Sequence, residues 1–223
     1  MTSPPLQMSS EGLSKAAADS VKHGKQIRVR VRDLTLRAFD AKQLDYEGMK
    51  EVLEAMAVGI SQGAQAHSNH MKQAVAEALS GLDQALMQSA EASRCALREL
   101  VRRDRELSDR ELKLAVEQMK KLDSDFVAVV NRVAESAAAN VAPEFRSFVM
   151  HAQRVGTETG SVVAQTMFEF SNRIAAQMLD AQAAGIEVAQ ELNRQFVQVA
   201  SGFLQSLAQA LRDGDAAERG NGD

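Results

Sequence analysis

Residues that interrupt helices are scarce in this chain. Its 223 residues include three prolines, and none of them lies between Leu6 and Ala142. From Leu82 to Ala142 there is no glycine either. Because β-strands need turn residues about every five to ten positions, a run of this length predicts helix. We therefore expect an all-α fold, built as an elongated helical bundle or a long helical hairpin with coiled-coil character.

Cysteine and long apolar runs are also nearly absent, and each absence excludes a class of protein. The single cysteine, Cys95, cannot form an internal disulfide, which favours a reducing cytoplasm. No stretch approaches the length of a membrane-spanning helix, and the first residues lack the pattern of a signal peptide. The net charge of −4 gives no general attraction to nucleic acid or anionic membrane. We expect a cytoplasmic protein.

Sequence motifs of enzymes and metal sites are missing. There is no G-x-S-x-G, C-x-x-C or H-E-x-x-H pattern. His67 and His70 are spaced to share a metal on one helix, but no nearby carboxylate or cysteine completes the ligand set. Arg94 and Arg98 flank Cys95 and would favour its thiolate, yet no motif joins it to a histidine base. We predict no catalytic activity, metal, cofactor or small-molecule substrate.

Alanine and glutamine are abundant, with 36 and 18 residues respectively. An alanine buries little area, so the core should be thin, and self-association would bury what one chain cannot. Residues 1–12 and 212–223 are poor in apolar side chains and are predicted to be disordered. That leaves residues 13–211 as a single elongated helical domain.

The first helix is expected over Leu13–Phe39, with an interruption at Gly24. Residues 27–31 alternate apolar and basic side chains as a strand would, but their apolar positions also fit helical spacing. We prefer helix, because a lone strand would have no sheet to join. The same region holds the only locally basic segment, which could contact phosphate or anionic lipid. Its basic residues are Lys22, Lys25, Arg28, Arg30 and Arg32.

A second stretch, from about Asp45 into the mid-90s, has small residues at its inward positions. Small side chains let two helices approach closely, which would justify glycines that each cost a helix interior about 1 kcal/mol. Helix weakness or a bend explains the same residues equally well. The positions are Gly59, Gly63, Ala66, Ala74, Ala78, Gly81 and Ala85.

Charged residues crowd the middle of the chain. From Arg98 to Lys113, 11 of 16 residues are ionisable and both signs are interleaved, which suits a solvated helical face. Ser108 and Glu111 match a capping box, so a helix could restart there or continue unbroken. We expect residues 45–141 to run out as one arm of a hairpin and 143–211 to return as the other.

Apolar residues after this charged run repeat in heptads. Steps of three and four residues, sustained over three repeats, predict a coiled-coil seam. Besides Ala115, the seam consists of Leu112, Met119, Leu122, Phe126, Val129 and Val133.

The last stretch begins at Pro143, which suits the first turn of a helix, and continues to Leu211. Gly156–Gly160 lacks the strand and lysine of a phosphate loop, so we interpret it as a weak point or close crossing in the helix. A second apolar row, starting at Phe168, widens the main stripe. From Thr159 to Leu211 only six residues are ionisable. The larger stripe residues are Val163, Met167, Phe170, Ile174, Met178, Val188, Leu192, Phe196, Val199, Phe203 and Leu207.

Residues 145–211, with segments such as AAQMLDAQAAGIEVAQELNRQFVQVASGFLQSL, resemble the helical region of phasins. Phasins are small bacterial proteins that coat polyhydroxyalkanoate storage granules. The resemblance implies a helical, granule-associated protein that self-associates and adsorbs through amphipathic helices. It implies no functional residue beyond the apolar stripe itself.

Two functions are therefore expected. The first is a non-enzymatic, phasin-like structural protein that coats an apolar surface or granule with its amphipathic helix. The alternative is a coiled-coil scaffold or adaptor that self-associates, with its basic segment contacting nucleic acid or anionic membrane.

Overall fold

The computed structural model describes residues 9–41, 46–66, 70–102 and 109–171, and every regular element within these ranges is a helix. The all-α prediction is therefore confirmed. No helix in these ranges is long and apolar enough to cross a membrane. The helices are α1 (Ser10–Lys22), α2 (Ile27–Ala41), α3 (Tyr46–Ala64), α4 (Met71–Arg102), α5 (Asp109–Ser136), α6 (Ala142–Val155) and α7 (Glu158–Glu169).

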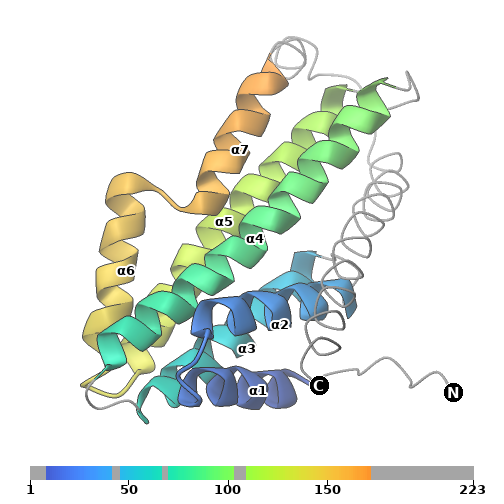
Figure 1. Ribbon diagram of the computed structural model, residues 1–223. Coiled ribbons are helices and arrows are strands. Elements are labelled where there is room, and N and C mark those ends of the chain that lie inside the picture. Colours follow the sequence, from blue (N-terminus) through green and yellow to red (C-terminus); the bar gives the residue numbers. More distant parts are fainter. Residues whose placement is uncertain (1–8, 42–45, 67–69, 103–108, 172–223) are drawn as a thin grey trace, which may run out of the picture.

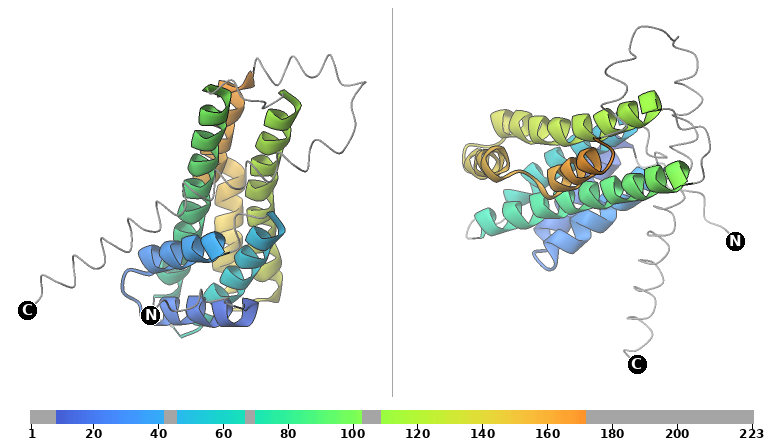
Figure 2. Two further views of the ribbon diagram at one scale, coloured as in Figure 1. Left: turned by 90° about the vertical axis from the view of Figure 1, so that its right-hand side faces the viewer. Right: turned by 90° about the horizontal axis from the view of Figure 1, so that it is seen from above.

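Two long helices, α4 and α5, run in opposite directions and set the length of the molecule (Figure 1). α6 and α7 follow one another along one side of this pair, and α7 lies between α4 and α5 when seen from above (Figure 2). α1, α2 and α3 lie together across the end that is far from α7 (Figures 1 and 2).

The single hairpin arm predicted over residues 45–141 is wrong, and residues 172–211 of the other predicted arm lie outside the described residues. The chain reverses between α4 and α5, and α5 begins at Asp109, so the restart suggested by the capping-box pattern is the correct alternative. Apart from this capping-box pattern, the charged run has no glycine or proline that would signal a reversal. Packing of α5 against α3, α6 and α7 decides the direction instead.

The N-terminal helices form where the sequence places them. α1 begins at Ser10, slightly before the expected Leu13, because the Ser9 hydroxyl accepts a hydrogen bond from the Gly12 N–H (3.2 Å) and caps the helix. The break falls at Gly24, whose φ of 66° is readily adopted by glycine. Residues 27–31 are helical, as preferred over a strand.

Small residues bring the N-terminal helices close to their neighbours. A Cβ on Gly59 of α3 would lie 2.1 Å from the Ser14 carbonyl oxygen of α1, and one on Gly81 of α4 would lie 2.3 Å from the Arg28 carbonyl oxygen of α2. The close-packing interpretation of these glycines is therefore confirmed. Ala66, which was also expected to face inward, is exposed.

The buried side chains form two clusters along the molecule. The larger lies where α1, α2 and α3 pack against the long helices and α6, and it includes the fully buried Phe39, Phe126 and Phe145. The smaller gathers residues of α4, α5 and α7, among them Leu97 and Leu112. α4 and α5 thus pass through both clusters.

The predicted weak point in the last stretch is confirmed. α6 starts with Pro143 in its first turn and ends at Val155, followed by Gly156 with a φ of 93°. α7 then starts at Glu158 and ends at Glu169. Within the described residues, the stretch from Pro143 is therefore two helices and not one continuous helix.

Candidate functional site

The junction between α6 and α7 is bound by a buried carboxylate from α4. Asp83, which is 5% exposed, accepts hydrogen bonds from the N–H groups of Glu158 (2.8 Å) and Thr159 (3.1 Å). It also accepts one from the Thr159 hydroxyl (2.7 Å). The first N–H groups of a helix have no partner within it and carry partial positive charge. Asp83 supplies that partner and a matching negative charge.

A second carboxylate, Asp123 on α5, reaches the same junction. It accepts a hydrogen bond from the Thr157 hydroxyl (2.5 Å), whose oxygen in turn accepts one from the Gly160 N–H (2.7 Å). Burial raises the pKa of Asp123, the bond from Thr157 lowers it, and the charge of Asp83 adds to the increase. Both long helices therefore contribute a carboxylate to the start of α7.

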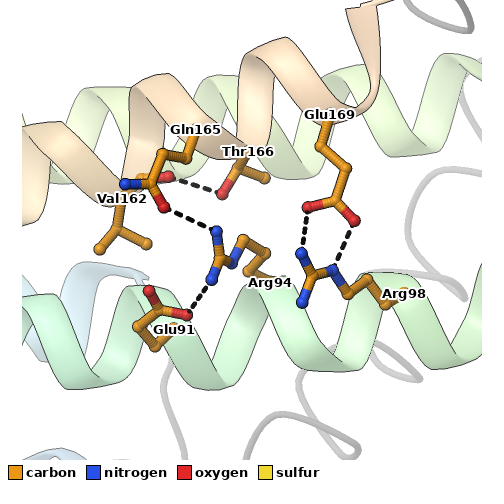
Figure 3. Close-up of polar contacts among 7 residues, drawn as sticks. All are labelled: Glu91, Arg94, Arg98, Val162, Gln165, Thr166 and Glu169. Carbon is orange, nitrogen blue, oxygen red and sulfur yellow. Dashed lines mark hydrogen bonds and ion pairs between the residues drawn. The ribbon is translucent and has the colours of Figure 1, made fainter.

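Polar contacts continue along α4 and α7 (Figure 3). Arg94 donates to Gln165 (2.9 Å) and pairs with Glu91 (2.8 Å). One turn further on, Arg98 donates two bonds to the Glu169 carboxylate (2.5 and 2.8 Å), which raise the pKa of Arg98. Exposed ion pairs of this kind add little stability, but their spacing sets the register of α7 on α4.

These polar groups form a structural clamp on α7. Both oxygens of Asp83 already accept hydrogen bonds, which leaves its carboxylate poorly placed for proton transfer or metal binding. Across the described ranges, no group of three or more His, Cys, Asp or Glu residues could hold a metal ion. Sequence reasoning missed Asp83 and Asp123, although Thr157 ahead of Glu158 is a recognisable helix-start signal.

The structure describes two of the three histidine and cysteine positions considered in the sequence. His70 is exposed, and His67 lies outside the described residues. Cys95 is a free, half-buried thiol. Its neighbours Arg94 and Arg98 are bound to Glu91, Gln165 and Glu169.

A small groove with a volume of about 50 Å³ lies between α4 and α5, and Thr159 of α7 and two residues of α3 also line it. Beside it, Tyr46 donates a hydrogen bond to Asp125, and the Lys121 ammonium sits 4.7 Å from the centre of the Tyr46 ring. Burial and the bond to Asp125 raise the pKa of Tyr46. The ten residues that line the groove are Tyr46, Met49, Ser89, Ala90, Ser93, Ala115, Gln118, Met119, Leu122 and Thr159.

Only the first residues of the apolar stripe lie within the described residues. Val163 and Phe170 are buried in the smaller cluster, and Met167 packs against it. Phe168, the first member of the second row, is 84% exposed. The remaining stripe residues, Ile174, Met178, Val188, Leu192, Phe196, Val199, Phe203 and Leu207, lie outside the described residues.

The predicted coiled-coil seam is an internal surface of α5. Leu112 and Met119 belong to the smaller cluster, whereas Phe126, Val129 and Val133 belong to the larger one. Leu122 is half-buried against the larger cluster. The heptad spacing is accounted for by contacts with helices of the same chain, and a coiled coil is not confirmed.

The basic segment spans the end of α1 and the first turns of α2. Lys22, Lys25 and Arg30 are exposed. Arg28 pairs with Glu77 of α4 (3.5 Å), and Arg32 with the adjacent Asp33 (2.8 Å). These acidic partners offset part of the positive charge that the sequence places here.

The described residues form an elongated helical bundle in which the other helices pack around α4 and α5. A family model described as "Family of unknown function (DUF6781)" matches residues 4–213. The chain therefore belongs to this family, over nearly its full length. Comparison with curated proteins and with solved structures gave no match.

Proposed function

We propose that this protein is a non-enzymatic, surface-associating helical protein that acts in the cytoplasm in the manner of phasins. The body formed by α1–α7 anchors a C-terminal segment, residues 172–211, that adsorbs to an apolar surface or granule. The free thiol of Cys95 suits a reducing compartment.

The exposure of Phe168 carries this proposal. A large aromatic side chain that is 84% exposed stands at the end of α7, directly before the charge-poor segment. Leu179, Ile186 and Leu204 continue its row in the sequence, next to the larger stripe. At about 25 cal/mol per Å² of apolar area, half-burial of a dozen such side chains would supply several kcal/mol, enough for reversible coating.

Flotation with polyester particles and with lipid vesicles tests the proposal. We expect the full-length protein to co-float with the particles at both low and high salt, because apolar burial is not screened by ions. Changing Phe196→Asp together with Phe203→Asp should abolish this binding. Full binding by the double variant would overturn the proposal.

A matched control adds the same two charges elsewhere. Met150 and Val155 on α6 are 64% and 66% exposed, so Met150→Asp with Val155→Asp should leave particle binding unchanged. A folded protein that binds no particles but sediments as an oligomer would favour the alternative, a self-associating scaffold. Because the heptad seam is occupied within the chain, such an oligomer would have to use other surfaces.

A further inference from the structure

We propose that the outer face of α6 binds the headgroups of an anionic lipid surface. Five exposed residues of α6 form this face: Arg146, Met150, His151, Arg154 and Val155. The inference goes beyond the proposed function, because it concerns the folded body of the protein and not its C-terminal stripe.

α6 is the outermost helix at one edge of the molecule (Figures 1 and 2). Of the described helices it contacts only α4 and α5, and it contributes the buried Phe145 and Val149 to the larger cluster. Phe148 also packs edge-to-face on Phe126 of α5, with 5.6 Å between the ring centres. These contacts fix one side of α6 on the bundle and leave its opposite side uncovered by any described helix.

Two large apolar side chains are exposed on this helix. Met150 is 64% exposed and Val155 is 66% exposed, whereas the exposed apolar side chains of α2, α3 and α5 are 39% to 44% exposed. Apolar area at this level of exposure gains free energy when a partner removes it from water. The outer face of α6 therefore favours a partner that has an apolar layer.

The arginines of the same face have no acidic partner. Neither Arg146 nor Arg154 makes a hydrogen bond or ion pair with a described residue, whereas Arg132 of α5 pairs with Glu54 of α3 (2.6 Å). The acidic residue of α6, Glu144, is half-buried in its first turn. The two guanidinium groups are thus available to phosphate groups, which arginine binds through paired hydrogen bonds.

The spacing of these residues combines both properties in one row. Arg146, Met150 and Arg154 follow one another at intervals of four residues, so they line one side of the helix over ~12 Å. A helix that lies in the plane of a lipid surface can bury Met150 below the headgroups while the arginines remain at the level of the phosphates. Nucleic acid offers phosphates without an apolar layer, and polyester offers an apolar layer without phosphates. An anionic lipid surface offers both.

Co-sedimentation with vesicles tests the site in full-length protein that carries Phe196→Asp and Phe203→Asp, so that the C-terminal stripe does not contribute. We expect binding at low salt to vesicles of phosphatidylcholine mixed with phosphatidylglycerol, and none to phosphatidylcholine alone. Arg146→Gln with Arg154→Gln should lower the partition coefficient about thirtyfold, because each basic residue near an anionic membrane contributes about 1 kcal/mol. Absence of binding to the anionic vesicles, or binding that survives the loss of both arginines, would overturn the proposal.

A matched control removes the same charge elsewhere. Lys25→Gln with Arg30→Gln also lowers the net charge by two, at exposed positions outside α6, and should leave vesicle binding unchanged. An equal loss in this control would mean that net charge alone decides the binding, and the assignment to α6 would be wrong.

Met150→Ser distinguishes a lipid surface from other partners that carry phosphate. This change removes apolar burial and keeps both arginines, so it should lower the partition coefficient several-fold. An unchanged partition coefficient would mean that only phosphate is recognised, and lipid would then be the wrong partner.

Polyester particles separate this inference from the proposed function. Arg146→Gln with Arg154→Gln, in protein with an intact stripe, should leave flotation with the particles unchanged. Particle binding without binding to anionic vesicles would support the proposed function and reject the α6 site, whereas the reverse result would support only the α6 site.

Discussion

Gly59 lies so close to the backbone of α1 that any side chain at this position would have to displace that backbone. We predict that Gly59→Ala lowers the free energy of unfolding by up to about 2 kcal/mol, since overpacking costs about 1–3 kcal/mol and the gain in helix propensity returns about 1. The Cβ would lie 2.1 Å from a carbonyl oxygen, which a rotamer change cannot relieve. Urea unfolding followed by circular dichroism measures the change.

Gly12 provides a control for Gly59, because it is also a glycine within a helix. It is exposed in α1, and the nearest atom to an added Cβ is the Ser9 hydroxyl oxygen at 3.3 Å. Gly12→Ala should therefore be neutral or slightly stabilising. Equal losses in the two variants would mean that close packing is not what Gly59 provides.

Asp123 makes stability depend on pH. Its pKa in the folded protein is raised above the ordinary value of 3.8, so the folded state binds a proton more tightly than the unfolded state does. Stability contributed by this group is therefore present at low pH and is lost as pH rises from about 4 through the folded-state pKa. Asn at this position keeps an oxygen acceptor for Thr157 and cannot ionise.

We predict that Asp123→Asn is at least as stable as the unaltered protein at pH 7, and that its advantage disappears as the pH is lowered toward 4. Urea unfolding at several pH values measures the difference between the two proteins, which removes the contribution of the other carboxylates. A difference that stays constant with pH would show that the Asp123 pKa is not raised.

At the scale of elements, α7 is held by hydrogen bonds to the buried Asp83 and by exposed ion pairs, and the two contribute differently to stability. Asp83→Ala leaves the N–H groups of Glu158 and Thr159 without their acceptor, at about 1–3 kcal/mol for each buried group, whereas the Thr159 hydroxyl keeps the backbone carbonyl of residue 83 (3.2 Å). We predict a total loss of about 3 kcal/mol in the free energy of unfolding and faster amide exchange in α7 than in α1.

Arg98→Ala removes only an exposed pair and should scarcely move the urea midpoint. Similar effects of the two changes would contradict the anchor.

Element boundaries could be predicted from the sequence wherever a residue with a backbone preference marks them. Gly24, Pro143 and Gly156 are such residues, and each lies at a helix end. The reversal between α4 and α5 has no such marker, because its charged residues are good helix formers and only tertiary packing turns the chain. Asp83 was equally hidden, since the amide groups that it binds lie 75 residues away in the sequence.

At the scale of the whole molecule, the expectation of a thin core is only partly right. Phe39, Phe126 and Phe145 are fully buried in the larger cluster, together with several alanines. The smaller cluster, at the α7 end, has fewer residues.

The paired contacts between α4 and α7 determine how far α7 extends along α4. Arg94 and Arg98 are one helical turn apart, and so are Gln165 and Glu169, their partners. Four residues inserted before Gln165 would preserve the faces of α7 but advance its end by ~6 Å, to the level of the last turn of α4. The length of α7 thus fixes the point along α4 at which the chain leaves this helix.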